Sequence, residues 1–270
     1  MTERILVAGS NGLIGAAVAA RLTAEGFVVV PFDVVDGHDV IDAADVRRAA
    51  EGCTAIVNAA GGHRPGVEPG ASVVTHNVTG NWNMLDAARH WGIGRVVTFS
   101  SVNALGCFRG EGPPAYFPID DDHPIRPPTA YGQSKRLVEE LCRCFTATTG
   151  IATIVFRPPA VVGPARWRKY AALLAADPAA EWTPFWEYGA WIDVRDLADA
   201  VLAALHCPDP GHITALVIAD DMAADEPAHA MATRLLPDVP WRGPLDAAVL
   251  VRNDVARTAL GWRPTRRWGE

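Results

Sequence analysis

A tyrosine and a lysine four residues apart, Tyr131 and Lys135, give the strongest chemical signal in the sequence. They stand at the start of a predicted helix, Ala130–Thr149, where residues i and i+4 lie on one face. A free phenol has a pKa of about 10, and a neighbouring ammonium lowers it by stabilising the phenolate. Such a pair exchanges a proton with an alcohol or a carbonyl compound. Because this spacing also arises by chance on helix surfaces, its meaning depends on what surrounds it.

Two serines, Ser100 and Ser101, follow the predicted strand Arg95–Phe99. In open α/β sheets, ligands gather outside the carboxyl ends of the strands. A hydroxyl at this place can hydrogen-bond the reacting oxygen and stabilise the charge that develops on it. The structural alternative for either serine is a turn residue or a helix cap.

Three glycines, Gly9, Gly12 and Gly15, follow the predicted strand Arg4–Ala8 and open the predicted helix Leu13–Glu25. A bound pyrophosphate needs backbone N–H donors and close approach, which glycine permits because it has no Cβ. The pattern predicts a dinucleotide site, and an ordinary strand–turn–helix junction is the alternative. The residues of this turn that we expect at the dinucleotide are Gly9, Asn11, Gly12, Leu13, Ile14 and Gly15.

An aspartate, Asp33, ends the predicted strand Phe27–Phe32 and lies 18 residues beyond Gly15. A carboxylate there accepts the adenosine ribose hydroxyls and repels the extra phosphate of NADP. No arginine or lysine occupies positions 10, 11, 34 or 35, so the sequence favours NAD. The alternative for Asp33 is a turn residue. Asp39 and Val40 are predicted to meet the adenine edge, with a solvated loop aspartate as the alternative.

Short β-branched runs alternate with helical stretches along the first half of the chain. This alternation predicts an α/β fold, a Rossmann-type doubly wound parallel sheet with a small C-terminal substrate lobe. We expect an NAD-binding Rossmann domain over residues 1–160, to which 191–220 contribute, and a lobe formed by 161–190 and 221–270. A Gly- and Pro-rich loop over 106–128 is too long for a plain connector and is predicted to be functional or mobile.

The composition excludes several classes of protein. A formal charge of −7 argues against a general nucleic-acid binder, and no apolar run is long enough to span a bilayer. The five cysteines are scattered, and Cys142 and Cys144 point to different sides of their helix, so we expect reduced thiols and no metal site. The chain start shows no signal-peptide pattern, which predicts a cytoplasmic protein.

Several segments appear in a shared order: the glycine run, Asn-Ala-Ala-Gly at 58–61, His-Asn-Val-Thr-Gly at 76–80, Ser100-Ser101 with Gly106, the Tyr–Lys segment 131–135, and 191–198 and 260–264. Together they resemble the extended short-chain dehydrogenase/reductase superfamily, also called the NAD-dependent epimerase/dehydratase family. The resemblance runs from about Ile5 to Pro264. It implies that the chain is an NAD-dependent enzyme.

The resemblance also implies roles for individual residues. Ser101 would be the catalytic Ser/Thr and Tyr131 the acid/base, while Lys135 would hold the nicotinamide ribose and lower the Tyr131 pKa. Asn77 would support the active site, with a helix-start cap as its structural alternative. Pro158, with Pro159, would pack near the nicotinamide. The remaining cofactor contacts that the resemblance implies are Asn58, Ala59, Ala60, Gly61 and Ser100.

Departures from the family pattern narrow the reaction. Dehydratases of the family carry an Asp-Glu pair directly after the catalytic residue, where this chain has Val102 and Asn103, so dehydration is not expected. The short C-terminal portion favours a small substrate and resembles the short sugar or uronate dehydrogenases. However, Val102 replaces a polar residue of that subgroup, and the segment 161–190 is longer here.

Substrate contacts fall in loops. The candidates are His63, Arg64, Asn103, Arg166 and Arg168 together with Ser101 and Tyr131, and a solvated loop residue is the alternative for each of the first five. An aromatic group could form a sugar platform, with core packing as its alternative; it comprises Trp167, Trp182, Phe185, Trp186 and Trp191.

Three functions remain open at this stage. The first is net oxidation of a hydroxyl, or its reverse, on a small polar substrate such as a sugar; the second is NAD-dependent epimerisation. The third, a non-enzymatic nucleotide sensor, would be expected to lose Tyr131 or Lys135, and both are present. By family analogy the helices Val73–Trp91 and Ala130–Thr149 pair across a homodimer.

Overall fold

The computed structural model describes residues 2–61, 70–108, 111–163 and 187–269, together with residues 172 and 176. Its centre is a six-stranded sheet in which every neighbouring pair is parallel, with the order β2-β1-β3-β4-β5-β8. The chain moves outward from β1 in both directions, so a crevice is expected at the carboxyl ends of β1 and β3. The strands are β1 (Arg4–Ala8), β2 (Val28–Phe32), β3 (Ala55–Asn58), β4 (Arg95–Phe99), β5 (Ala152–Arg157) and β8 (His212–Leu216).

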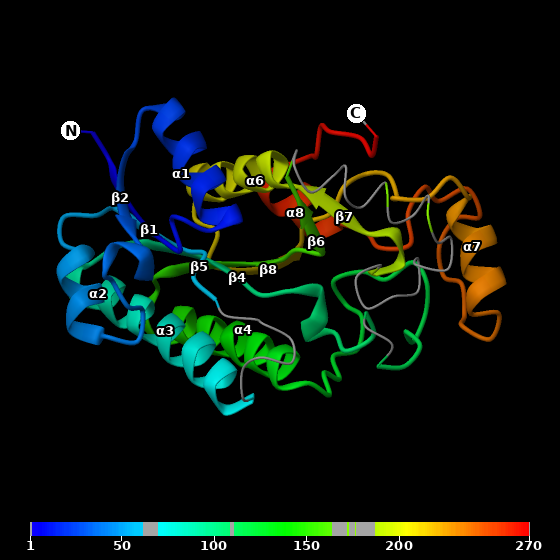
Figure 1. Ribbon diagram of the computed structural model, residues 1–270, viewed down its shortest axis with the longest axis horizontal. Helices are drawn as coiled ribbons and strands as arrows, with labels where there is room; N and C mark the ends of the chain where they lie inside the picture. Colours follow the sequence, from blue (N-terminus) through cyan, green and yellow to red (C-terminus); the bar gives the residue numbers. More distant parts are fainter. Residues whose placement is uncertain are drawn as a thin grey trace.

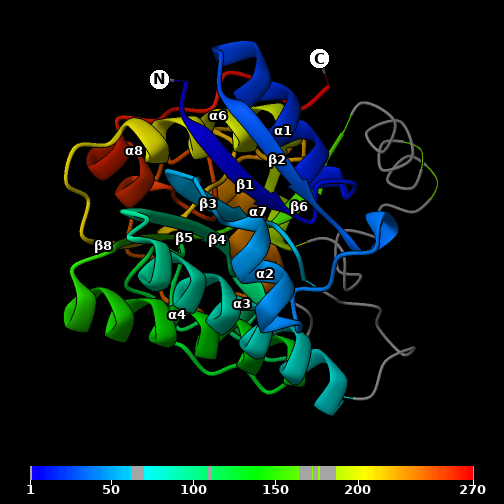
Figure 2. The same cartoon turned by 90° about the vertical axis from the view of Figure 1, so that its left-hand side faces the viewer.

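Helices cover both faces of this sheet (Figures 1 and 2). One face packs against α1 (Leu13–Glu25), α6 (Val194–His206) and α8 (Asp254–Leu260), and the other against α2 (Ala43–Ala49), α3 (Gly70–Trp91) and α4 (Ala130–Thr149). Along β1, Ile5 and Val7 point to the first face while Leu6 and Ala8 point to the second, as the two-residue period of a strand requires. The predicted Rossmann-type fold class is confirmed.

A third core cluster lies beyond the sheet, at the end of the molecule that carries α7 (Ala228–Leu235) (Figure 1). It includes residues of β6 (Ala160–Val162) and β7 (Trp191–Asp193), which pair with each other in a separate two-stranded sheet. Within 191–220, which we predicted to contribute to the Rossmann domain, β8 is a strand of the main sheet and α6 packs on it, whereas β7 pairs with β6.

The loop over 106–128 is held in this third cluster rather than projecting from the molecule. Phe117 and Ile119 are buried, and their N–H groups donate to Pro240 O and Leu250 O, both at 2.8 Å. Around Phe117 and Ile119 the loop is therefore packed against the C-terminal part of the chain. Among the described helices, none is long and apolar enough to cross a membrane.

Candidate active site

The glycine turn after β1 is closed against the end of β3. Gly9 has φ +74°, and a Cβ on it would stand 2.7 Å from the backbone of Ala59 and Ala60. A Cβ on Gly15 would stand 2.0 Å from Gly9 O, which forces glycine where α1 crosses the turn. Backbone therefore approaches backbone here, and N–H groups at the start of α1 are left open to a phosphate.

A cleft of about 610 Å³ begins at this turn and continues past Asp33. It is lined by Gly9, Asn11, Gly12, Phe32, Asp33, Val34, Val35, His38, Val40, Ala59, Ala60, Gly61 and His76. Many of these are residues that the sequence predicted for the cofactor. His38 and His76 were not predicted as cofactor contacts; His38 belongs to no recognisable pattern, and His76 was noted only as the first residue of the family segment 76–80. His38 stacks on Phe32 with ring centroids 4.8 Å apart and contacts the Asp45 carboxylate.

The Asp33 carboxylate accepts hydrogen bonds from Asn11 N at 3.0 Å and Val35 N at 3.1 Å. Asp33 therefore both caps its own turn and lines the cleft. The Asn11 side chain donates to Asp36 at 2.7 Å, although Asp36 is not among the residues that line the cleft. A 2′-phosphate at Asp33 would meet a like charge, whereas ribose hydroxyls would find an acceptor.

Asp39 and Val40 differ in their placement. Val40 is buried and lines the cleft, and its carbonyl accepts from Asn83 Nδ2 at 2.8 Å. Asp39 is exposed, caps its own turn by accepting from Ile41 N, and is not among the residues that line the cleft. Of the two predicted adenine contacts, the geometry favours Val40.

Lys135 joins three elements beneath the cleft. It extends from α4, donates from Nζ to Phe99 O at 2.9 Å, and lies 5.7 Å from the centroid of the Tyr131 ring. A Cβ on Gly61, which follows β3, would stand 3.2 Å from Nζ. Burial lowers the pKa of Lys135 to about 8, and the negative charge of Glu139 opposes this shift by raising the pKa. The structure thus brings together three residues predicted for the active site: Tyr131, Lys135 and Gly61.

The Ser101 hydroxyl is oriented by Asn103. Ser101 Oγ accepts from the Asn103 backbone N–H at 3.2 Å and from its Nδ2 at 3.0 Å, and both residues are buried. A hydroxyl oxygen accepts two hydrogen bonds and donates one. Ser101 therefore keeps its hydrogen for another oxygen. Asn103 Oδ1 is buried without a hydrogen-bond partner in the described part of the chain.

Asn77 supports the turn that carries Tyr131. It lies well inside α3, so the helix-start cap considered from the sequence is wrong. Its Nδ2 donates to Ser134 Oγ at 2.8 Å, and that hydroxyl donates to Tyr131 O at 2.7 Å. Its Oδ1 is buried without a partner among the described residues. A Cβ on Gly61 would lie 3.4 Å from this oxygen.

Other predicted site residues have structural contacts. The Ser100 hydroxyl donates to buried Glu139 at 2.7 Å, which directs it beneath the cleft rather than into it. Asn58 Oδ1 accepts from Ala60 N at 3.2 Å, and Pro158 O accepts from Val102 N at 3.1 Å.

Several predictions lie outside the described residues: His63, Arg64, Arg166, Arg168, Trp167, Trp182, Phe185 and Trp186. Trp191 is described, and it is buried with its indole N–H on Asp221 at 3.0 Å and its ring 5.2 Å from that of Trp268. For this residue, core packing is the correct interpretation.

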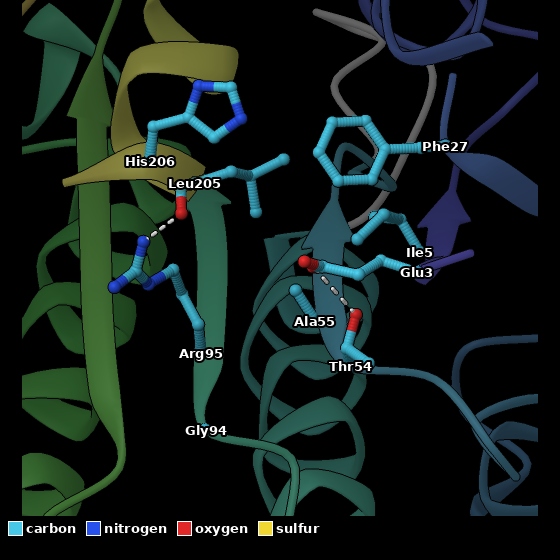
Figure 3. A pocket seen from close by; sticks show the side chains of 9 residues that line it. All are labelled: Glu3, Ile5, Phe27, Thr54, Ala55, Gly94, Arg95, Leu205 and His206. Atoms are coloured by element: carbon cyan, nitrogen blue, oxygen red, sulfur yellow. Dashed lines mark hydrogen bonds between the residues drawn. The ribbon is translucent and has the colours of Figure 1, made fainter. Parts of the chain in front are cut away.

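A second hollow of about 260 Å³ lies at the opposite, amino edge of the sheet (Figure 3). Phe27 and His206 stand on opposite walls, and the guanidinium of Arg95 is bound to backbone carbonyls at the end of α6. Because Arg95 begins β4 whereas Ser101 follows its end, this hollow is separate from the predicted catalytic residues. Among the described residues, no cluster of side chains could hold a metal ion.

Comparison with known proteins decides the family. The model of the NAD dependent epimerase/dehydratase family matches residues 5–219. The chain belongs to this family. Uronate dehydrogenase of Pseudomonas syringae pv. tomato is 26% identical over 81% of this chain and 75% of the relative. UDP-glucose 4-epimerase of Rhizobium meliloti is 27% identical over 97% of this chain and 92% of the relative.

Solved structures share the fold. A short-chain dehydrogenase/reductase superfamily protein from Agrobacterium tumefaciens, with bound NAD, has a TM-score of 0.74 at 23% identity, covering 98% of this chain and 94% of its own. UDP-glucose 4-epimerase from Brucella ovis, in complex with NAD, has a TM-score of 0.75 at 21% identity over the same shares. The NAD dependence of the family confirms the predicted cofactor, and the glycine cradle and the Asp33 carboxylate fit it.

Proposed function

We propose that this family member is an oxidoreductase that moves a hydride between NAD and the hydroxyl or carbonyl carbon of a small polar substrate, a sugar or sugar acid. The observation that carries the proposal is the buried Lys135 ammonium, placed between Phe99 O, the Tyr131 ring and Gly61, which lines the cleft. A buried cation beside a phenol favours phenolate, the form that takes a proton from an alcohol.

The residues of the chain divide the proton chemistry between them. NAD, when bound, supplies the hydride acceptor or donor. Tyr131 Oη takes the alcohol proton as the carbon gives up its hydride and the carbonyl forms, and returns that proton in the reverse direction. Ser101, whose oxygen already accepts two N–H donors, donates its hydrogen to the substrate oxygen. Lys135 keeps the phenol acidic, and Asn77 holds its turn in place.

Substrate oxidation is tested by mixing the pure protein with NAD, or NADP in parallel, and a panel of sugars and uronates, and following the nicotinamide absorbance. We expect a rise with at least one sugar or sugar acid, preferentially with NAD, and none with Tyr131→Phe. An absorbance rise that Tyr131→Phe leaves undiminished would refute the assignment of the proton step.

Epimerisation is the second candidate, since the Rhizobium meliloti epimerase aligns with 97% of this chain. It returns the hydride to the other face of the substrate, so the cofactor is not consumed. A constant absorbance together with a changed sugar in the NMR spectrum would establish it instead. The retained set of Ser101, Tyr131 and Lys135 speaks against a sensor without catalysis.

The remaining proposals concern the whole molecule. We propose that residues 161–190 and 221–270 form the substrate lobe, supported by the separate core cluster around α7. We propose a homodimer through α3 and α4, where Trp82 and Leu137 are 46% and 47% exposed. Light scattering tests the dimer. The five cysteines, all described, are free, which suits a cytoplasmic location.

A further inference from the structure

A buried ion pair lies directly beneath the proposed catalytic residues. Glu139, one turn beyond Lys135 on α4, accepts from Arg157 Nε at 2.7 Å and from Arg157 Nη2 at 2.9 Å. The side chains of Glu139 and Arg157 are 2% and 5% exposed. Removing two charges from water costs about as much as their attraction returns, so such a pair is weak evidence of a stabilising role. Its place in the fold suggests another role.

Two side chains of α4 that lie one helical turn apart contact the residues at the carboxyl end of β4. Lys135 Nζ donates to Phe99 O at 2.9 Å, and Glu139 Oε1 accepts from Ser100 Oγ at 2.7 Å. Phe99 and Ser100 are the two residues that precede Ser101. The spacing between Ser101, which follows β4, and Tyr131 on α4 therefore depends on these two contacts.

We infer that Glu139 is a positioning residue, which fixes the end of β4 against α4 and keeps Lys135 in its charged form for proton transfer at Tyr131. The reference to proton transfer rests on the proposed function. The contacts of Glu139 with Ser100 and Arg157 do not depend on it.

The charges near Lys135 support this role. Burial lowers the pKa of Lys135, and the Glu139 carboxylate is the charge that raises it. The other neighbours on α4 are the phenol of Tyr131 and Arg136, which reaches Glu139 from the surface at 3.2 Å.

Groups on the other elements contribute less. From β5, Arg157 is paired with Glu139 and donates to Asp121 O at 3.3 Å. The Asp121 carboxylate, whose pKa burial raises to about 6, accepts from the backbone of Leu216 and Val255. From α3, Asn77 is uncharged and His76 lines the cleft. Glu139 is thus the anion that opposes the desolvation of Lys135.

The sequence makes a direct measurement possible because it contains only two lysines, Lys135 and Lys169. In protein labelled with ¹³C,¹⁵N-lysine, the side-chain resonances give the protonation of each, and Lys169→Arg assigns them. We expect Glu139→Gln to move the Lys135 titration midpoint about 1 pH unit lower, as the loss of a nearby opposite charge requires. The matched control is Glu140→Gln, the next residue on α4 but an exposed one, which should leave the midpoint unchanged.

Two further variants keep the test decisive. Glu139→Asp retains the charge and should restore the midpoint. If Glu139→Gln does not fold, the pair is removed as a unit in Glu139→Gln/Arg157→Gln, which should still lower the midpoint because it removes the anion that raises the Lys135 pKa. A midpoint equal to that of Glu140→Gln in the folded variants would overturn the inference.

Kinetics separate this inference from the proposed function. With a sugar that the unsubstituted enzyme oxidises, Glu139→Gln should lower kcat about tenfold, the equivalent of ~1.4 kcal/mol, while KM changes less than about twofold. A rise in KM alone would contradict the positioning role. If no sugar is oxidised, the proposed function fails, yet the lysine titration still decides whether Glu139 keeps Lys135 charged.

Discussion

Replacing Asn103 by leucine is expected to slow the reaction without weakening the fold. Ser101 Oγ has two acceptor sites, and Asn103 fills both, with its N–H at 3.2 Å and its Nδ2 at 3.0 Å. The variant keeps the backbone donor and removes the amide. The hydroxyl is then able to turn and accept a hydrogen bond from the substrate alcohol, which would direct the alcohol hydrogen away from Tyr131.

The magnitude follows from the contact that is lost. A neutral hydrogen bond contributes about 1 kcal/mol, so kcat/KM should fall ~5–10-fold in the nicotinamide absorbance assay. Asn103 Oδ1 is buried without a partner among the described residues, and an unsatisfied group of this kind costs about 1–3 kcal/mol. Its removal should therefore leave the Tm equal or higher.

A double-mutant cycle shows whether Asn103 acts through Ser101. In a Ser101→Ala background, Asn103→Leu should change kcat/KM by less than about twofold. The matched control is Asn253→Leu, which removes another buried amide, bound to Ile218 O at 2.7 Å, and should lower the Tm alone. An equal loss of kcat/KM in both backgrounds would show that Asn103 acts on the substrate independently, and the orientation argument would be wrong.

Three further outcomes are expected. Gly9→Ala should abolish NADH binding, measured by cofactor fluorescence, because its Cβ would lie 2.7 Å from the β3 end. Asp33→Ala should reduce the NAD-over-NADP ratio of kcat/KM about tenfold, by loss of ribose acceptors worth ~1.4 kcal/mol. Lys135→Met should abolish activity yet raise stability at pH 7, since lowering the pKa from 10.5 to about 8 corresponds to about 3 kcal/mol. That gain in the free energy of unfolding should shrink between pH 8 and 10.5, where only the unfolded lysine stays charged.

The elements that carry the catalytic residues were predictable because their boundaries have local causes. The limits of α4 match the prediction, since Thr129 caps its first turn and Gly150 ends it with φ 75°. The strand β4 is a short β-branched run that is buried on both faces. By contrast, the three-residue strand β6 and the helices α7 and α8 were not predicted, because short elements leave little periodicity to detect.

The contacts between these elements were not predictable from the sequence. Nothing in the spacing of Ser101 and Asn103 shows that the amide donates to the hydroxyl, because this depends on the turn between them. The pairing of Glu139 with Arg157 joins residues on a helix and a strand, and only the packed fold places them together. Because tertiary structure determines these contacts, the sequence identified candidate residues but not their hydrogen-bond partners.

The loop that follows Ser101, the proposed catalytic serine, is joined to the C-terminal part of the chain by reciprocal backbone hydrogen bonds. Phe117 N donates to Pro240 O while its carbonyl accepts from Arg242 N, and Ile119 makes the same exchange with Leu250 and Arg252. A chimera designed to have the substrate specificity of a relative would have to exchange both the loop around Phe117 and Ile119 and the segment 240–252. Exchanging only one of them would disrupt the backbone hydrogen bonds that join the two. Changes in substrate preference are therefore expected to arise through paired substitutions far apart in the gene.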